Sequence, residues 1–299
     1  MHFTITAFCL ILAGMSGFNS TRSKAIHATQ LGQAESFGAL RADFAQNNPG
    51  YGLNYYPSTT GLQPAADDRV VFVQGLDGRT DEPAMGDILL VRAGEEWTAP
   101  EGVAVDLLSF SLPDTLPEEL PAIIRPDWDP KITDTPGGCA TEGDAYRRIL
   151  LTWKPEVGPY ILNSLNAHRV RIKDSFSHFH PVDGGFDEFY LVQEAPEGAR
   201  LLTSRHVEAI QAQAVDLEQS RNLIQSRELR AGDLVYMPRG TMHRGLGGAL
   251  VQVISVPGFV PRAEIGLDHH LKAINEKLGL TGDSALPIHA GASRDAVVK

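Results

Sequence analysis

Two histidines and a glutamate within a short stretch, and a third histidine further along, are the residues of this chain best suited to chemistry. The stretch runs from His178 through His180 to Glu188, and the later imidazole is that of His243. Because side chains alternate faces along an extended strand, His178 and His180 point the same way and can share one metal ion. An Asp-Gly-Gly turn at residues 183–185 sends the chain back, which can bring Glu188 beside them.

The backbone before His243 indicates how this third histidine reaches the same point. Pro238 ends a short apolar strand and Gly240 permits a tight bend, so a strand across a barrel could present His243 to the other ligands. Three neutral imidazoles and one carboxylate suit a borderline divalent transition ion and leave coordination positions open. The expected ligands of one such ion are His178, His180, Glu188 and His243.

These segments resemble the two sequence motifs of the cupin superfamily. The second family motif is Gly, five residues, Pro-x-Gly, two residues, His, three residues and Asn. The chain is similar to it at Gly232, Pro238, Gly240 and His243, with Gly247 where Asn is usual. The resemblance points to a superfamily rather than to a particular enzyme. It implies β-barrels of the jelly-roll type, with a metal site inside a barrel.

The first family motif, His-x-His followed by Glu, is matched more loosely. Seven residues separate His180 from Glu188, where the family has three or four, and Ile172 stands in place of the leading glycine. The longer spacer leaves the carboxylate ligand open between Glu188, Asp183 and Asp187.

The chain also repeats part of its own sequence. Residues 86–97 align without gaps on residues 232–243, and Trp97 then takes the place of His243. Such self-similarity indicates a duplicated unit. Any strand-turn-strand segment that opens with Gly-Asp would look alike, so a chance match stays the alternative.

A second alignment lies upstream of the first. Residues 70–74 match residues 189–193 in pattern, which puts Arg69 where Glu188 stands, and no His-x-His pair precedes Arg69. We therefore predict an all-β fold of two cupin-type barrels, a bicupin, with a few short helices. The N-terminal barrel keeps the architecture without the metal ligands.

Changes in composition divide the chain into five segments. Prolines at high density predict an extended, stiff linker between the barrels, and apolar residues such as Leu116 and Ile124 favour its packing against a barrel. A helix is expected in the tail, with Asp268 as its N-cap and Gly279 as its end. The segments are a signal peptide (1–28), a degenerate barrel (29–112), the linker (113–140), the metal-binding barrel (141–262), and a helix and tail (263–299).

An insertion at residues 194–231 has no counterpart of similar length in the first half. A helix is expected within it, around residues 207–224. The insertion can be interpreted as a lid over the pocket, a dimerisation element or a plain surface excursion. A homodimer is therefore one of the expected assemblies.

Two further side chains are predicted to act beside the metal. Tyr190 shares the strand parity of Glu188 and could hydrogen-bond a metal-bound ligand, although a tyrosine inside a barrel is as often core. Arg239 and Arg244 flank the second motif, and either could neutralise an acidic substrate. Tyr190 and Arg239 are the predicted catalytic residues.

Net charge and the amino terminus bear on partners and location. A formal charge of −11 and a pI near 5.3 argue against a nucleic-acid partner and against an anionic membrane surface. The apolar run before Met15 resembles a signal-peptide core, and residues 23–25 offer a cleavage site. We expect a secreted or periplasmic protein without a membrane anchor in its mature form, or a cytoplasmic one if translation starts at Met15.

The metal site leads to three functional hypotheses. The favoured one is a dioxygenase-type oxidoreductase that binds a small organic substrate at one ferrous ion, as many cupins do. The alternatives are non-redox isomerase, lyase or decarboxylase chemistry on a sugar or organic acid, and a small-ligand-binding protein without turnover. Because ligand type alone does not fix the metal, Mn²⁺, Ni²⁺ and Zn²⁺ stay alternatives to Fe²⁺.

Overall fold

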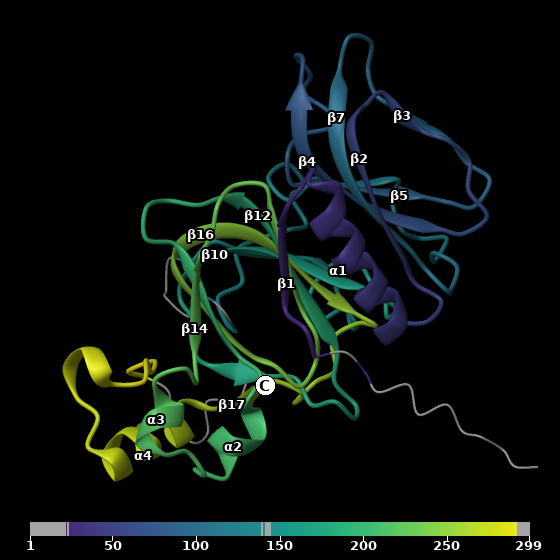
Figure 1. The fold of residues 1–299 in the computed structure, drawn as a ribbon. Coiled ribbons are helices and arrows are strands. Elements are labelled where there is room, and N and C mark those ends of the chain that lie inside the picture. Colours follow the sequence, from purple (N-terminus) through teal and green to yellow (C-terminus); the bar gives the residue numbers. More distant parts are fainter. Residues whose placement is uncertain (1–21, 23, 139, 141–144, 292–299) are drawn as a thin grey trace, which may run out of the picture.

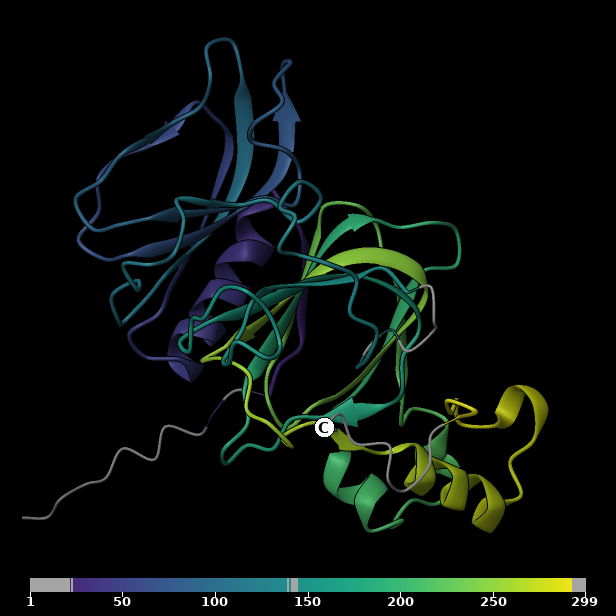
Figure 2. The same ribbon diagram turned by 180° about the vertical axis from the view of Figure 1, so that it is seen from behind.

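Two β-sheet bodies with a helix between them make up the fold (Figures 1 and 2). The computed structural model describes residues 22, 24–138, 140 and 145–291. Most of the expected signal peptide therefore lies outside the described residues. The all-β prediction with a few short helices is confirmed, and no described helix has the length and apolar character needed to cross a bilayer.

The N-terminal half is built on a five-stranded sheet in the order β2-β7-β4-β5-β8, with β3 and β6 paired beside it. All neighbouring strands are antiparallel. The strands are β2 (Gly52–Thr59), β3 (Gly61–Leu62), β4 (Arg69–Asp77), β5 (Ile88–Val91), β6 (Trp97–Thr98), β7 (Ala104–Ser111) and β8 (Ile123–Ile124).

The C-terminal half is a ten-stranded antiparallel sheet that curls into a barrel, with the path β1-β15-β12-β16-β10-β9 as its body. The long strand β16 joins both walls, because it pairs with β10, β11, β12 and β13. The strands are β1 (His27–Gln30), β9 (Arg147–Leu151), β10 (Asn166–Asp174), β11 (His178–Phe179), β12 (Asp187–Glu194), β13 (Arg200–Ser204), β14 (Gln225–Glu228), β15 (Asp233–Met237), β16 (Met242–Val256) and β17 (Ile265–Gly266).

The helices follow the expectations with two corrections. The tail helix α4 (Asp268–Leu278) ends at Gly279, whose φ of 66° is left-handed, but its N-cap is Leu267 rather than Asp268. The insertion holds two short helices, α2 (Val207–Gln211) and α3 (Leu217–Ser220), instead of one long one. The others are α1 (Ala34–Asn47) and a 3₁₀ turn, η1 (Gly282–Ser284).

The two halves pair their strands in matching register, as the internal alignment predicts. Val70 of β4 lies opposite Leu90 of β5, and the aligned residues Phe189 and Tyr236 lie opposite each other in β12 and β15. Arg69 holds the position that Glu188 has in the second half. The same strand arrangement therefore occurs twice, which favours duplication over a chance match.

The first half lacks the ligands at the positions where the second half has them. Trp97 pairs with Leu62 across β6 and β3, whereas His243 pairs with His178 across β16 and β11. An indole and an aliphatic side chain cannot coordinate a transition ion. Among the described residues, both groups able to hold a metal lie in the C-terminal half.

The boundaries between the halves are less simple than the expected segments. The boundary at residue 29 falls inside β1, which pairs with β15 of the second barrel. The linker at 113–140 contributes β8 to the edge of β5 in the first half. Leu116 and Leu120 in this linker are buried in the shared core, so the linker packs against the sheets as its apolar residues indicate.

A single apolar core joins the two halves. Its members come from α1, from β4 and β7 of the first sheet, and from β12, β15 and β16 of the second. Phe44 of α1 is fully buried at its centre, with ring centroids 5.8 Å from Phe110, 5.2 Å from Phe189 and 5.9 Å from Tyr236. A separate apolar cluster, which includes Tyr190, fills the interior of the C-terminal barrel.

Candidate metal centre

Three imidazoles converge inside the C-terminal barrel. The register of β11 on β16 sets His178 directly opposite His243, and the ring centroids are 4.2 Å apart. The ring of His180 lies 5.4 Å from that of His178 and 5.1 Å from that of His243. One ring nitrogen from each residue lies within 4.8 Å of the other two, and all three side chains are 1% exposed.

Backbone carbonyls orient two of these rings. The Nδ1 atom of His178 lies 3.1 Å from the carbonyl oxygen of Phe176, and Nδ1 of His180 lies 3.1 Å from that of Phe186. An Nδ1–H that donates to a carbonyl fixes the tautomer whose Nε2 carries a lone pair. Nε2 is therefore the atom that each of these rings would offer to a metal. His180 is also stacked on the ring of Phe186, at 3.9 Å between centroids.

Glu188 supplies the carboxylate beside the imidazoles. Its Oε1 lies 3.1 Å from Nε2 of His243, and its Oε2 lies 3.8 Å from Nε2 of His180. It is 2% exposed on β12. Of the two alternatives, Asp183 is exposed in the turn, and Asp187 faces the opposite side of β12; neither belongs to the groups of described residues able to hold a metal.

Burial controls the protonation of this cluster. Desolvation lowers the pKa of His178 and of His243 to about 4, and moves that of His180 well below its ordinary value. Desolvation raises the pKa of Glu188 to about 7, against the lowering effect of His178. The imidazoles are therefore neutral at physiological pH, which is the form that binds metal.

The four ligand atoms fit a divalent transition ion. Within the described part of the chain, Nε2 of the three histidines and Oε1 of Glu188 are buried and make no hydrogen bond. Buried polar atoms without partners are costly, and a cation bound between groups that face one another in this way would remove that cost. The nitrogen and oxygen donors suit zinc, iron, manganese or nickel alike.

A second carboxylate that the motifs do not reveal adjoins the centre. Glu264 is 7% exposed and forms, with His180 and Glu188, another group able to hold a metal. The short strand β17, which pairs with β11, carries it there. Desolvation, followed by the charge of Glu188, raises the pKa of Glu264 to about 8. Its Oε2 has no hydrogen-bond partner among the described residues.

The two predicted catalytic residues lie apart from the pocket described below. Tyr190 is fully buried, and its ring is edge-on to His243 at 6.2 Å between centroids. Tyr190 lies on the same face of β12 as Glu188, as predicted, and its side chain packs in the core of the barrel. Arg239 is turned away, with its guanidinium 2.8 Å from Asp187 and 2.8 Å from Asn48. This placement does not fit the expected contact of Arg239 with substrate.

Asp187 is the centre of a buried network behind the metal site. Its carboxylate accepts hydrogen bonds from Tyr236, Asn48, Arg22 and Arg239. Charge-assisted bonds of this kind hold a strand in place. Because Asp187 and Glu188 are neighbours on β12, the network fixes the segment that presents Glu188 to the imidazoles.

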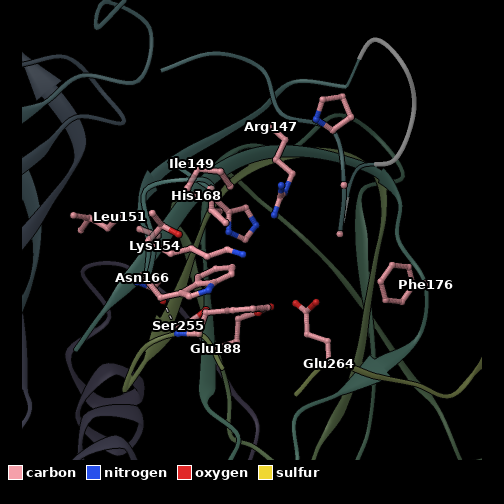
Figure 3. Close-up of a pocket in the computed structure, with 18 of the residues that line it drawn as sticks. Arg147, Ile149, Leu151, Lys154, Asn166, His168, Phe176, Glu188, Ser255 and Glu264 are labelled. Atoms are coloured by element: carbon pink, nitrogen blue, oxygen red, sulfur yellow. Dashed lines mark hydrogen bonds between the residues drawn. The ribbon is translucent and has the colours of Figure 1, made fainter. Parts of the chain in front are cut away.

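A pocket of about 640 Å³ adjoins the carboxylate side of the centre, where Glu188 and Glu264 line it and the three histidines do not (Figure 3). Glu188 and Glu264 lie on one side of it, and Arg147, Lys154 and His168 lie on the other. Apolar side chains form much of the remaining wall, including Ile149, Leu151, Trp153, Phe176 and Phe259. A volume of this size accommodates a small organic molecule, for which roughly 300–1,000 Å³ is usual.

His168 is a pocket residue that the sequence motifs do not mark. It lies on β10 ten residues before His178, with the same parity, and its partner on β9 is Ile149. Desolvation and then Arg147 lower its pKa well below the ordinary value. The alternation along β10 is the signal that could have found it, since Val170 and Ile172 on the same face line the barrel core.

Three other histidines and Arg244 lie away from the centre. His206 is at the start of α2, and His269 and His270 are on α4 with their rings 3.9 Å apart. None of them belongs to the metal-binding groups of the described residues. Arg244 is paired with Asp174 at 2.6 Å.

Among the comparisons with known proteins, only the one with solved structures found similar proteins. No family model matches the chain, and no curated protein matches it either. Oxalate decarboxylase of Bacillus subtilis at pH 4.6 is similar at a TM-score of 0.44 and 13% identity, over 84% of each chain. Procruciferin, the 11S globulin of Brassica napus, has a TM-score of 0.42 and 11% identity over 73% of this chain and 78% of that one. AerE from Microcystis aeruginosa has a TM-score of 0.41 and 11% identity, over 69% of this chain and 85% of that one.

Proposed function

We propose that this protein is a metal-dependent enzyme that acts on a small organic substrate inside the C-terminal barrel. The observation that carries the proposal is the convergence of the imidazoles of His178, His180 and His243, whose Nε2 atoms are buried and unbonded among the described residues. The carboxylate of Glu188 adjoins them, 3.1 Å from Nε2 of His243 and 3.8 Å from Nε2 of His180. The pocket is lined by Glu188 and Glu264, so a substrate in it would lie on the carboxylate side of the centre. Three imidazoles and one carboxylate leave coordination positions for that substrate.

The protein's own side chains have separate tasks in this scheme. The imidazoles stay neutral, and Glu188 gives up its proton when it becomes a ligand. Glu264 lies close enough to hold or accept a proton at Oε2 beside the reacting atoms, which a pure binding protein does not need. A bound divalent ion would supply Lewis-acid or redox chemistry at the open positions.

Oxygenase chemistry with ferrous iron is the form of the proposal that we favour. The centre is almost fully enclosed, and an enclosed site protects reactive species from water. Non-redox lyase, isomerase or decarboxylase chemistry is the second candidate. Glu264 supports it, because a second carboxylate at a metal site provides the acid or base that such reactions require.

Metal analysis of variants tests the site itself. Untagged wild-type protein is expected to retain one transition ion per chain, and His180→Ala to lose most of it, because one of the four converging donors is gone. His269→Ala is the matched control, since His269 lies outside the centre on α4, and it should bind metal as wild type does. Full metal occupancy in His180→Ala would contradict the proposal.

Anaerobic reconstitution separates the two chemistries. Protein loaded with ferrous, manganous, nickel or zinc ions is screened with catechols, diketones, hydroxy acids and sugar phosphates for oxygen uptake and product. Oxygen consumption with iron alone supports the oxygenase. Turnover without oxygen and with several metals, abolished by Glu264→Gln, supports the non-redox alternative. The absence of turnover with every metal, although a ligand stabilises the fold, would contradict both.

A further inference from the structure

The wall of the pocket that faces the metal centre carries positive charge. Arg147 extends from β9 and Lys154 follows that strand, and Figure 3 shows both side chains on the side opposite Glu188 and Glu264. The amino group of Lys154 reaches inward next to His168. Two cationic side chains in one pocket are notable in a chain with a net charge of −11, and they favour a negatively charged ligand.

Structural ion pairing does not account for Lys154. It is exposed, and no salt bridge of the described residues includes it. Arg148, its neighbour in sequence on β9, points the other way and is paired with Asp127 and Asp134. Arg147 alternates with Arg148 along β9 and lies in the pocket, where its guanidinium Nη1 also donates to the carbonyl oxygen of Thr135 at 3.0 Å.

The charges in the pocket favour an anion. A divalent ion at the centre would offset the charges of Glu188 and Glu264 even if both are ionised, which leaves the ammonium of Lys154 to attract an anion. An anionic group between Arg147 and Lys154 would neutralise this ammonium. Charge-assisted hydrogen bonds from arginine and lysine are the usual means of holding a carboxylate.

The rest of the wall indicates what the anion must carry. Trp153 is stacked on Phe259 at 4.3 Å, and Phe259 lies 5.2 Å from Phe186, the ring that packs on the ligand His180. This aromatic row leads from the pocket to the metal centre. A volume of about 640 Å³ leaves room for a ring or a short chain beside the charged group.

We propose that the pocket binds an organic carboxylate with an apolar body, anchored by Arg147 and Lys154 and packed on the Trp153–Phe259 pair. The inference rests on the proposed metal-dependent function and names the class of its substrate. The carboxylate meets the cationic wall, so the apolar body extends toward the metal side of the pocket. Neutral analogues of the same shape lose the anchor and bind more weakly.

Binding of matched acid and amide pairs tests this assignment. Benzoate, phenylacetate and hexanoate are each compared with the corresponding amide by calorimetry on metal-loaded protein. At least one acid is expected to bind about tenfold more tightly than its amide, and Lys154→Met should weaken that acid by about tenfold. Lys272→Met, an exposed lysine on α4, is the control and should leave affinity unchanged. Trp153→Ala should weaken the ring-bearing acids and spare acetate.

The outcomes separate this inference from the proposed function. The carboxylate assignment would be overturned if acids and amides bound equally, or if Lys154→Met bound the acid as tightly as wild type does. If the protein still held one metal ion per chain, the proposed metal-dependent function would be unaffected by either result. Tighter binding of methyl phosphate or sulfate than of any carboxylate would overturn it as well. Acid binding that depends on Lys154 in a protein that retains no metal would support the anion site and contradict the metal-dependent function.

Discussion

Single residues in the metal centre combine burial with the absence of hydrogen-bond partners. His178, His180 and His243 are each 1% exposed, and Glu188 is 2% exposed. In such surroundings an imidazolium or a carboxylate is poorly solvated, so the neutral forms are favoured until a cation arrives. Metal binding therefore competes with one proton on Glu188 over the physiological range, and with protons on the imidazoles only in acid.

The pH dependence of metal affinity follows from this. The pKa of Glu188 is raised to about 7, so its proton must leave when metal binds below that pH. The pKa of His178 and of His243 is about 4, so these rings add no further competition until about pH 4. Affinity should fall about tenfold per pH unit from about pH 7 down to about 4, and more steeply below. Chelator competition at several pH values measures it.

Glu188→Gln is the control for this titration. The amide carries no proton that metal must displace, so the slope between about pH 7 and 4 should disappear while overall affinity is lower. A slope nearer a hundredfold per unit would show that Glu264 also releases a proton. A steep loss beginning near pH 6.5, the ordinary value for histidine, would contradict the buried, neutral imidazoles.

The sequence predicted part of this centre and missed the rest for a physical reason. The predicted ligands His178, Glu188 and His243 lie on strands and His180 directly follows β11, and the alternation and turns of these strands can be read from the chain. Glu264 follows no motif, and it reaches the centre only because β17 pairs with β11, a contact between distant segments. Arg239 was expected at the substrate, but Asp187, which the sequence offered as a ligand, takes its guanidinium instead.

Strands at the junction of the two halves cross the segment boundaries that the sequence predicts. Strand β1 pairs with β15 and the linker strand β8 pairs with β5, so each sheet gains an edge strand from outside its repeat. The apolar pattern identified the paired strands within each repeat. It could not identify these edge partners, because two- to four-residue strands have too short a pattern to be recognised.

Helix α1 is expected to be the main apolar link between the sheets. Phe44 has no exposed surface, and its ring contacts aromatic rings from both halves. Phe44→Ala should cost about 3–5 kcal/mol of unfolding free energy, because a cavity opens where the two sheets meet. Urea unfolding measures the loss. Leu217→Ala on α3, where the side chain is 52% exposed, should stay within about 0.5 kcal/mol of wild type.

On the scale of the whole molecule, the first half packs against the second, and its described residues include no group able to hold a metal. Its sheet repeats the register of the metal barrel, with Trp97 and Leu62 where the second half has His243 and His178. The shared core covers the outer face of β12, on which Phe189 and Leu191 alternate with the inward-facing Glu188 and Tyr190. The strand that carries Glu188 is thus held from both sides, which couples the stability of the two halves.

This coupling predicts one unfolding transition that metal shifts for both halves. Trp128→Phe/Trp153→Phe leaves Trp97 as a fluorescent probe of the first half, and Trp97→Phe/Trp128→Phe leaves Trp153 for the second. Both probes should report the same urea midpoint. Metal at about a hundredfold excess over its Kd should stabilise both by about 2.7 kcal/mol, because it binds only the folded protein. Two separate midpoints, with metal moving only that of Trp153, would show that the halves unfold independently.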